Sequence, residues 1–380
     1  MTVEYDQKQQ TDMIDGGRRD MIKATGAGIV AATLGGVSLA SGQSTNPAAT
    51  KTIRWGIVGT GGIANSMATK IQQADHAELG AVSSRKMASA EAFAKEHAVP
   101  KAFDSWSDMC KFDDVDAIYV ATPTSVREEI CIAAANNGKH VLGEKPFASL
   151  ASVQRITKAC LSNGVGFMDG THFVHHPRTH RIKTVTSEQV GWPWSIASAF
   201  QFGLGDKGNI RYNTTLEPYG AIGDAGWYNM RCAVEFSAPG VDIDRVESFL
   251  RRDPDTGAAV SGSGVIIFND GSTSTWNCGF ESGAGIMDLR ISGAKGVIKL
   301  DDFLSQRPAN QPADYEYRQG WNDTEMKEVA TAKRGSVLMF EDFAEMVDDP
   351  AKIRASMDAT ARTQAWLDAI WESALKNEKA

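Results

Sequence analysis

The sequence has few cysteines, and no two of them stand in a CxxC pair. There are five, spread over residues 110–278, and no zinc-type spacing occurs among them. An odd number of scattered thiols favours small buried side chains over a disulfide framework. The histidines within residues 172–180 have no cysteine or acidic cluster beside them, so we predict no metal site.

The chain also lacks an excess of basic charge. Its 39 lysines and arginines are outnumbered by 47 acidic residues, and the formal net charge is −8. No basic patch interleaves with aromatic residues, so nucleic acid is not an expected partner. The length of 380 residues exceeds what one ordinary core holds, and two domains are therefore expected.

No apolar run is long enough to cross a membrane. The most apolar stretch near the N-terminus, residues 24–40, is weaker and shorter than the ~20 strongly apolar residues that a spanning helix needs. It follows an Arg-Arg pair, two apolar positions and a lysine within residues 18–23, and this order resembles a twin-arginine export signal. Residues 38–40 could serve as a cleavage site before a Ser/Thr/Pro/Ala linker.

We therefore predict a signal and linker over residues 1–51 and a periplasmic or otherwise exported protein. The alternative is a disordered arm that contains Arg-Arg by chance. The twin-arginine route carries folded proteins, and it suits an enzyme that must fold around a cytoplasmic nucleotide before export.

A short strand, a glycine turn and a helix follow the linker. Residues 53–58 are apolar and β-favouring, and the next six residues follow the pattern G-x-G-x-x-A. Gly59 permits a tight turn, Gly61 lets the backbone approach a pyrophosphate, and Ala64 lets the helix pack on the strand. The helix N-terminus would face the phosphates with free N–H groups. The cofactor contacts predicted here are Gly59, Thr60, Gly61, Gly62, Ile63 and Ala64.

The end of the second expected strand, residues 77–83, indicates which cofactor binds. An enzyme that uses NAD usually has an acidic residue there, whereas this chain has Ser84 and Arg85, followed by a lysine. Glu78 lies at the wrong end of the strand. Hydroxyls and cations suit a 2′-phosphate, so Ser84 and Arg85 favour NADP over NAD. Arg85 could instead begin a solvated helix.

Strands and helices continue to alternate to about residue 142, which predicts a doubly wound parallel sheet of the Rossmann type. Ligands bind at the carboxyl ends of such strands. Thr122 and Pro123 follow one strand, and Glu144 and Lys145 follow the next. These four residues are further candidate cofactor contacts.

The combination of motifs resembles the Gfo/Idh/MocA oxidoreductases. The glycine turn, the Thr-Pro turn and Glu-Lys-Pro at residues 144–146 are followed by Gly-Ala-Ile-Gly-Asp-Ala-Gly-Trp-Tyr at residues 220–228, which looks like the second signature of that family. Residues 168–171 and 175–178 are similar to a subgroup of plant oxidoreductases, dihydrodiol dehydrogenases and NADP-dependent xylose dehydrogenases. Tyr228, where many members have histidine, agrees with that subgroup.

The resemblance implies an α/β protein of two parts. A Rossmann domain would occupy residues 52–170, and an α/β domain with a large, open, mostly antiparallel sheet would occupy residues 171–353. The last helix, within residues 354–380, would pack back on the first domain. Residues 243–300 do alternate β-type runs with turns, including an Asp-Gly hairpin signal. The open sheet implies a homo-oligomer.

Three residues are expected to form the reaction centre: Lys145, Asp224 and Tyr228. Asp224 and Tyr228 are four apart in an expected helix and share a face. An unperturbed tyrosine has a pKa of ~10, and a nearby Lys145 ammonium would favour the phenolate as acid/base. Asp224 could orient either partner or hold a sugar hydroxyl. Taken singly, these could be a turn lysine, a helix cap and a core aromatic; together with the nucleotide turn they predict a site.

Other residues are candidates for substrate contact. Arg211, in a polar loop, resembles a family arginine near cofactor and substrate, although it could be an exposed loop cation; His175 could also contact substrate. Arg127 stands where many relatives have histidine, and its role is open. Three tryptophans are candidate sugar-stacking platforms, or else sheet core or oligomer surface: Trp192, Trp194 and Trp276.

We expect an NADP-dependent oxidoreductase that transfers a hydride to or from a sugar or diol, with Lys145, His175, Arg211, Asp224 and Tyr228 binding the substrate. An exported enzyme would hold its cofactor tightly and regenerate it with a second substrate. One alternative is a glycosidase of the same fold that uses nicotinamide for transient redox. Another is a non-catalytic nucleotide-binding regulator, although such relatives usually lose the lysine or the Asp/Tyr pair.

Overall fold

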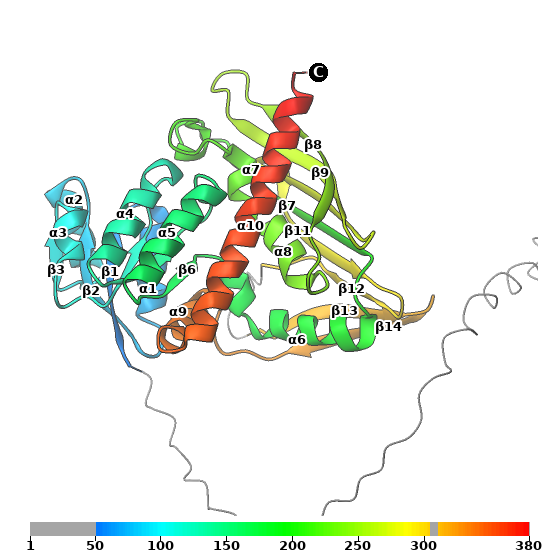
Figure 1. Ribbon diagram of the computed structural model, residues 1–380, viewed down its shortest axis with the longest axis horizontal. Coiled ribbons are helices and arrows are strands. Elements are labelled where there is room, and N and C mark those ends of the chain that lie inside the picture. Colours follow the sequence, from blue (N-terminus) through cyan, green and yellow to red (C-terminus); the bar gives the residue numbers. More distant parts are fainter. Residues whose placement is uncertain (1–50, 305–310, 380) are drawn as a thin grey trace, which may run out of the picture. The chain divides into compact units, whose positions relative to one another are not determined.

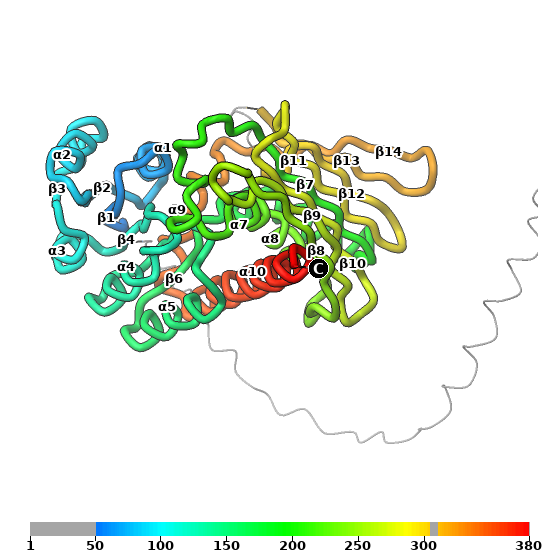
Figure 2. Tube along the Cα trace, turned by 90° about the horizontal axis from the view of Figure 1, so that it is seen from above, coloured from blue at the N-terminus to red at the C-terminus, as the bar shows by residue number. Residues whose placement is uncertain are grey.

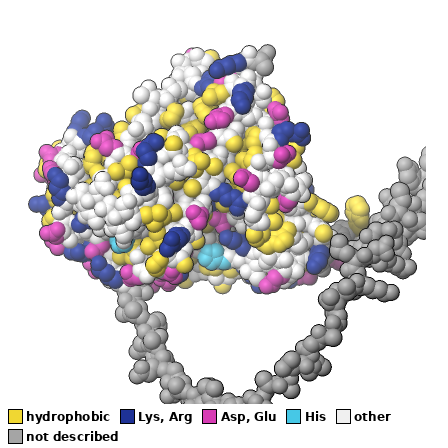
Figure 3. Space-filling model, in the orientation of Figure 1, with side chains coloured by type: hydrophobic (Ala, Val, Ile, Leu, Met, Phe, Trp, Pro, Cys, Tyr) yellow, Lys and Arg dark blue, Asp and Glu magenta, His cyan; other side chains and the backbone are white. Residues whose placement is uncertain are grey.

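The computed structural model describes residues 51–304 and 311–379. The predicted export signal and linker therefore lie outside the described residues, except for Lys51. Among the described residues, no helix is both long enough and apolar enough to cross a bilayer. On the face shown in Figure 3, acidic and basic side chains are interspersed.

The first sheet is parallel and has six strands in the order β3-β2-β1-β4-β5-β6. β4 has four buried residues in succession, because helices cover both faces of a doubly wound sheet. This confirms the predicted Rossmann sheet. The strands are β1 (Ile53–Val58), β2 (Ala77–Ser83), β3 (Lys101–Phe103), β4 (Ala117–Val120), β5 (His140–Gly143) and β6 (Phe167–Asp169). The helices between them are α1 (Gly62–Ile71), α2 (Met87–Glu96), α3 (Trp106–Cys110), α4 (Thr124–Asn136) and α5 (Leu150–Ser162).

The second sheet has eight strands in the order β14-β13-β12-β11-β7-β10-β9-β8. All neighbours are antiparallel except β7 and β10. Gly271 has φ +84° between β9 and β10, as the Asp-Gly hairpin signal predicts. The strands are β7 (Ser195–Gly203), β8 (Ile243–Arg252), β9 (Ala259–Phe268), β10 (Thr273–Gly279), β11 (Glu281–Ser292), β12 (Val297–Leu300), β13 (Ala313–Gln319) and β14 (Asp323–Val329).

Helices cover one face of the second sheet (Figures 1 and 2). α7 (Gly220–Asp224), α8 (Gly226–Phe236) and α10 (Pro350–Asn377) pack against its central and β8-side strands, whereas α6 (Pro177–Val185) lies beside β14. Ser274, Trp276 and Cys278 of β10 are consequently buried, whereas Thr275, which points to the opposite face, is exposed. The predicted mostly antiparallel sheet is confirmed, and one of its faces lacks a helical cover among the described elements.

Helix α10 contacts both sheets. It packs against β8 and also against β6 and α5. The side chain of Gln364 accepts a hydrogen bond from the Phe147 N–H (2.9 Å), and that of Asp368 accepts one from the Leu150 N–H (2.7 Å). The described residues form one compact unit, and the domain boundaries expected at residues 170 and 353 stay predictions.

All five cysteines are buried and unpaired. Burial raises the pKa of the thiols, to about 11 for Cys110 and about 12 for Cys160. The cysteines therefore act as small apolar side chains in the packing, as their scattered spacing predicted.

Candidate active site

The glycine turn between β1 and α1 has the form that a dinucleotide needs. Gly59 has φ +108°, and a Cβ there would lie 2.7 Å from the carbonyl oxygen of Ala121, so only glycine fits. Cβ atoms added at Gly61 and Gly62 would instead enter open space. No side chain caps the first turn of α1, so its N–H groups are available to an anion.

The end of β2 lies beside this turn. The hydroxyl oxygens of Thr60 and Ser84 are 3.4 Å apart, and Arg85 follows with an exposed side chain. Glu78 lies opposite Arg54 of β1 in the strand register, near the start of β2. It is therefore about five residues, or ~16 Å of extended strand, from the carboxyl end of β2. The group next to the turn is thus made of hydroxyls and a cation, as the sequence indicated.

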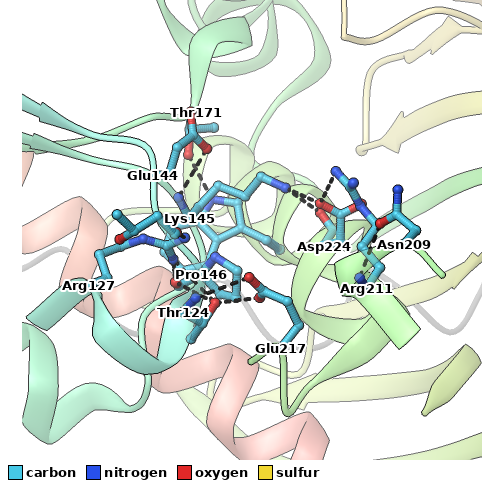
Figure 4. A network of polar contacts seen from close by, with 12 residues as sticks. Thr124, Arg127, Glu144, Lys145, Pro146, Thr171, Asn209, Arg211, Glu217 and Asp224 are labelled. Carbon is cyan, nitrogen blue, oxygen red and sulfur yellow. Dashed lines mark hydrogen bonds and ion pairs between the residues drawn. The ribbon is translucent and has the colours of Figure 1, made fainter. Parts of the chain in front are cut away.

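Lys145 follows β5 and reaches towards α7 and α8 (Figure 4). Its ammonium donates to Asp224 Oδ1 (2.7 Å) and to the Asp224 carbonyl oxygen (2.8 Å), and it lies 4.8 Å from the ring centroid of Tyr228. The lysine side chain is 8% exposed. The structure therefore brings together the three residues that the two motifs pointed to, although the motifs are about 80 residues apart.

Arg211 joins this group through Asp224. Its Nε donates to Asp224 Oδ2 (2.7 Å) and one terminal nitrogen donates to Oδ1 (3.3 Å). Burial alone would raise the pKa of the Asp224 carboxyl, but Lys145 and Arg211 hold it well below its usual range. Asp224 is therefore an ionised carboxylate shared by two cations, and Arg211 is not an isolated loop cation.

Tyr228, at the start of α8, differs from expectation in its protonation. Its ring is almost completely buried, and burial together with the charges of Glu144 and Asp224 raises the pKa of the phenol well above its usual value. The expectation that the Lys145 ammonium favours the phenolate is wrong for this structure. The main reason is the burial of the phenol, and the Asp224 carboxylate, 2.7 Å from the Lys145 ammonium, also offsets the charge of that ammonium.

His172 lies nearer to Tyr228 than the sequence analysis could indicate, whereas His175 is paired elsewhere. His175 pairs through Nδ1 with Asp342 Oδ2 (2.6 Å) in α9 (Gly335–Met346), and among the described residues no hydrogen bond or ring contact joins it to Lys145, Asp224 or Tyr228. Its contact with substrate stays a prediction. The ring of His172 lies 5.8 Å from that of Tyr228. Burial lowers the pKa of His172 to about 4, so the ring is neutral.

The tryptophans do not line this centre. Trp276 is buried in the sheet, whereas Trp192 and Trp194 are exposed just before β7. Phe200, near the other end of β7, packs edge-on against Tyr228. Six residues of extended strand span ~20 Å, so Trp192 and Trp194 lie too far away to stack on a sugar held at Tyr228.

Two glutamates support the turns around the centre. Glu144 is buried, accepts from the Tyr119 hydroxyl (2.6 Å) and the Lys145 N–H (3.3 Å), and has a carboxyl pKa raised by burial. Glu217, from the loop before α7, accepts from the backbone N–H (3.0 Å) and hydroxyl (2.6 Å) of Thr124, directly after the Thr122-Pro123 turn. The sequence gives no local signal for the Glu217 contact.

No metal centre accompanies these residues: the described part of the chain has no group of three or more histidine, cysteine, aspartate or glutamate residues placed to hold an ion. The polar groups that converge here are one ammonium, one guanidinium, one carboxylate and one phenol, and they gather around Lys145, two residues beyond the carboxyl end of β5. This arrangement can hold a hydroxyl or carbonyl oxygen and exchange a proton with it.

Comparisons with known proteins agree with this chemistry. Residues 53–171 match the family model described as "Oxidoreductase family, NAD-binding Rossmann fold". D-xylose 1-dehydrogenase (NADP(+)) 2 of Haloferax volcanii is 29% identical over 323 residues, which are 84% of this chain and 97% of the relative. A dTDP-3,4-didehydro-2,6-dideoxy-alpha-D-glucose 3-reductase from Actinomadura kijaniata is 28% identical over 277 residues, 72% of this chain and 82% of that one.

Solved structures share the fold. A 3-ketoreductase from Actinomadura kijaniata, in complex with NADP and TDP-benzene, superposes with a TM-score of 0.78 at 24% identity and covers 85% of this chain and 98% of its own. An aldose-aldose oxidoreductase from Caulobacter crescentus superposes with a TM-score of 0.76 at 20% identity, covering 86% and 98%. The four proteins are named as a dehydrogenase, a reductase, a ketoreductase and an oxidoreductase, and three of the names include a sugar.

Proposed function

Because the chain belongs to the Gfo/Idh/MocA family of oxidoreductases, we propose that it transfers a hydride between NADP and a hydroxyl or carbonyl carbon of a sugar or diol. The observation that carries the proposal is the contact of the Lys145 ammonium with Asp224 and with the face of Tyr228, at the carboxyl end of β5. A buried ammonium and a buried phenol side by side suit the proton transfer and charge stabilisation that carbonyl–alcohol interconversion needs.

The residues present fit the cofactor. Gly61 and the N-terminus of α1 leave room and donors for the pyrophosphate, and Ser84 and Arg85 are placed for a 2′-phosphate. Relatives whose names or structures include NADP support that choice. The nicotinamide, when bound, supplies or accepts the hydride, and the protein provides the geometry and the proton.

Tyr228 is proposed to exchange the proton. Because the pKa of its phenol is raised, the hydroxyl is protonated near neutral pH and can donate its proton to a substrate carbonyl oxygen during reduction. In the oxidation direction, the deprotonated form of the same side chain, the phenolate, takes the proton from the substrate hydroxyl and becomes the neutral phenol. Lys145 donates a hydrogen bond to the reacting oxygen and stabilises the negative charge that develops there, while the hydrogen bond to Asp224 holds the lysine side chain in place.

The function can be tested by following nicotinamide absorbance. Purified protein is mixed with NADP+ and a panel of aldoses and diols, or with NADPH and the corresponding carbonyl compounds. Turnover by wild type, lost in Lys145→Met and Tyr228→Phe, supports the proposal. Release of the leaving group from an aryl glycoside without net nicotinamide reduction would favour a glycosidase. Nucleotide binding without any turnover would favour a regulator.

We also propose that the protein is exported by the twin-arginine route and keeps its nucleotide tightly bound. The proposal rests on the Arg-Arg pair and the weakly apolar stretch within residues 18–40. Fusing residues 1–51 to a reporter that is active only after export tests it. The fusion should be exported, and replacing Arg18 and Arg19 by lysine should stop export; export that persists would contradict it.

The uncovered face of the second sheet is proposed to pair with a second copy. By register, the central strands carry small residues on this face, Ala197 and Ala199 on β7, Ser263 on β9 and Thr275 on β10, and β11 adds the exposed Asp288 and Arg290 beside them. A surface of small residues with both signs of charge at its side can supply the ~800 Å² per partner that a stable dimer buries. Light scattering should give a dimer mass, and Ala199→Glu should give a monomer. A monomeric wild type would contradict the pairing.

A further inference from the structure

Arg127 is a buried cation between the two turns that border the reaction centre. It lies on α4 and is 3% exposed. One terminal nitrogen, Nη1, donates to the carbonyl oxygen of Pro146 and to the hydroxyl of Thr124 (3.3 Å), and the other, Nη2, donates to the carbonyl oxygen of Thr122 (Figure 4). A single planar group therefore joins the turn after β4 to the turn after β5.

The surroundings of Arg127 do not favour a burial that serves stability alone. Within residues 51–304 and 311–379, no carboxylate forms an ion pair with it, although its charge partly offsets the rise that burial causes in the pKa of the Glu144 carboxyl. Its Nε is buried without a hydrogen-bond partner. Burying a guanidinium whose hydrogen-bond partners are all neutral costs several kcal/mol, and an apolar side chain of similar volume would avoid that cost. A role in holding the two turns at a fixed distance explains an arginine at this position better than packing does.

The carbonyl groups of Thr122 and Pro146 lie beyond the last backbone hydrogen bond between the β4 and β5 segments. β4 and β5 pair from Ala117 to Val120, and the last hydrogen bond between these segments runs from the Glu144 N–H to the Val120 carbonyl oxygen (3.1 Å). Beyond this bond no backbone hydrogen bond joins the two segments. Arg127 bonds the carbonyl groups two residues further along each segment, and so extends the connection beyond the sheet.

We propose that Arg127 is a positioning residue, which holds the Lys145–Pro146 backbone at a set distance from the Thr122–Pro123 turn. Lys145 would thereby keep its ammonium aligned between Asp224 and the reacting oxygen. The proposal rests on the proposed function, because it assigns a part in that reaction. The two terminal nitrogens of a guanidinium can each donate to a different carbonyl, which a lysine, with its single ammonium, cannot bridge equally well.

The test compares Arg127→Met and Arg127→Lys with Arg155→Met. Arg155 also joins α4 to α5, through Glu128, but its side chain is exposed and away from the turns, which makes it a matched control. We expect kcat of Arg127→Met to fall ~10- to 100-fold, while KM for the sugar and Kd for NADPH change less than ~3-fold. Arg127→Lys should recover part of kcat, and Arg155→Met should match wild type.

A primary deuterium isotope effect on kcat distinguishes a misaligned Lys145 from a general loss of folded structure. It should increase in Arg127→Met, because a misplaced Lys145 slows the hydride step itself. Equal losses in kcat, in NADPH affinity and in the thermal midpoint, with no change in the isotope effect, would overturn the proposal. If Arg127→Met does not fold, the same comparison is made with Arg127→Lys, whose intermediate kcat is required.

Hydrogen exchange keeps this inference distinct from the proposed function. In Arg127→Met, amides within residues 121–126 and 143–149 should exchange at least ~10-fold faster than in wild type and in Arg155→Met, whether or not a sugar is turned over. A wild type without any turnover would refute the proposed function. Unchanged exchange in both segments would refute the connection between the turns.

Discussion

Replacing Lys145 by methionine removes one charge and three contacts from the centre. Methionine has a similar length and fills most of the space, but it cannot donate to the Asp224 carboxylate or carbonyl, and it brings no cation over the Tyr228 ring. Arg211 would still neutralise Asp224 through its 2.7 Å contact. The substitution therefore tests the ammonium with little change in packing.

The expected effects follow from the geometry. Removing one partner from a buried ion pair costs about 3–5 kcal/mol. Because Arg211 still neutralises Asp224, we expect a loss below this range, about 2–3 kcal/mol of stability, or a fall of about 5 °C in the thermal midpoint. The effect on the reaction should be larger. Losing one donor to a developing oxyanion lowers kcat by ~100- to 1,000-fold. NADPH binding should change little, because the glycine turn is untouched.

Lys139→Met is the matched control. Lys139 is also buried, and its ammonium donates to the carbonyl oxygens of Phe112 and Val115, both at 2.8 Å. It should lose stability to a similar extent but keep kcat within ~3-fold of wild type. Thermal midpoints, steady-state absorbance kinetics and NADPH titrations of the three proteins complete the set. A Lys145→Met enzyme that keeps kcat within ~3-fold of wild type would refute the assigned role of Lys145.

Three other predictions concern the proton, the cofactor and the turn. Because the pKa of the Tyr228 phenol is raised, the phenol stays protonated at neutral pH; the rate of reduction should therefore not depend on pH near neutrality and should fall in alkali. The rate of oxidation, which needs the phenolate, should instead rise with pH. Tyr228→Phe should lose most activity and both pH dependences, and pH profiles equal to those of wild type would contradict this. Arg85→Ala should weaken NADP binding on the order of tenfold and leave NAD binding unchanged, because only NADP has the 2′-phosphate. Lys95→Ala, in the last turn of α2 and so at the other end of that helix from Arg85, serves as control, and equal losses for both nucleotides would exclude a 2′-phosphate contact. Gly59→Ala should lower nucleotide affinity more than tenfold. Gly138 also has positive φ but has open space around it, so Gly138→Ala should lower stability only. Equal nucleotide affinities of Gly59→Ala and wild type would show that the turn does not bind nucleotide.

The fold was largely predictable because its strongest signals are local. The G-x-G-x-x-A turn, the alternation of strands and helices and the Asp-Gly hairpin each depend on a few adjacent residues. The parallel pairing of β7 with β10 was not predictable, since it joins segments about 75 residues apart without a short connection. Contacts of α10 with the turn after β5, such as Gln364 with Phe147, span 217 residues and have no local signal either.

The site was predictable where a motif carried it. Lys145 and Asp224 come from two signatures, and the structure places them in contact. Glu217 and His172 were not assigned to their places, because their partners are distant in the chain and any polar loop residue has the same local pattern. The direction of the Tyr228 pKa depends on burial and on a carboxylate that neutralises the neighbouring ammonium, and both are tertiary properties.

The central claim is that this chain binds NADP and passes a hydride between it and a sugar or diol. The most direct measurement is the fluorescence of reduced nicotinamide in the purified mature protein, before and after adding an aldose such as xylose or glucose. We predict bound nucleotide whose reduced signal changes on adding sugar, in wild type but not in Lys145→Met. Bound nucleotide whose signal no sugar or diol changes, in either direction, would contradict the claim.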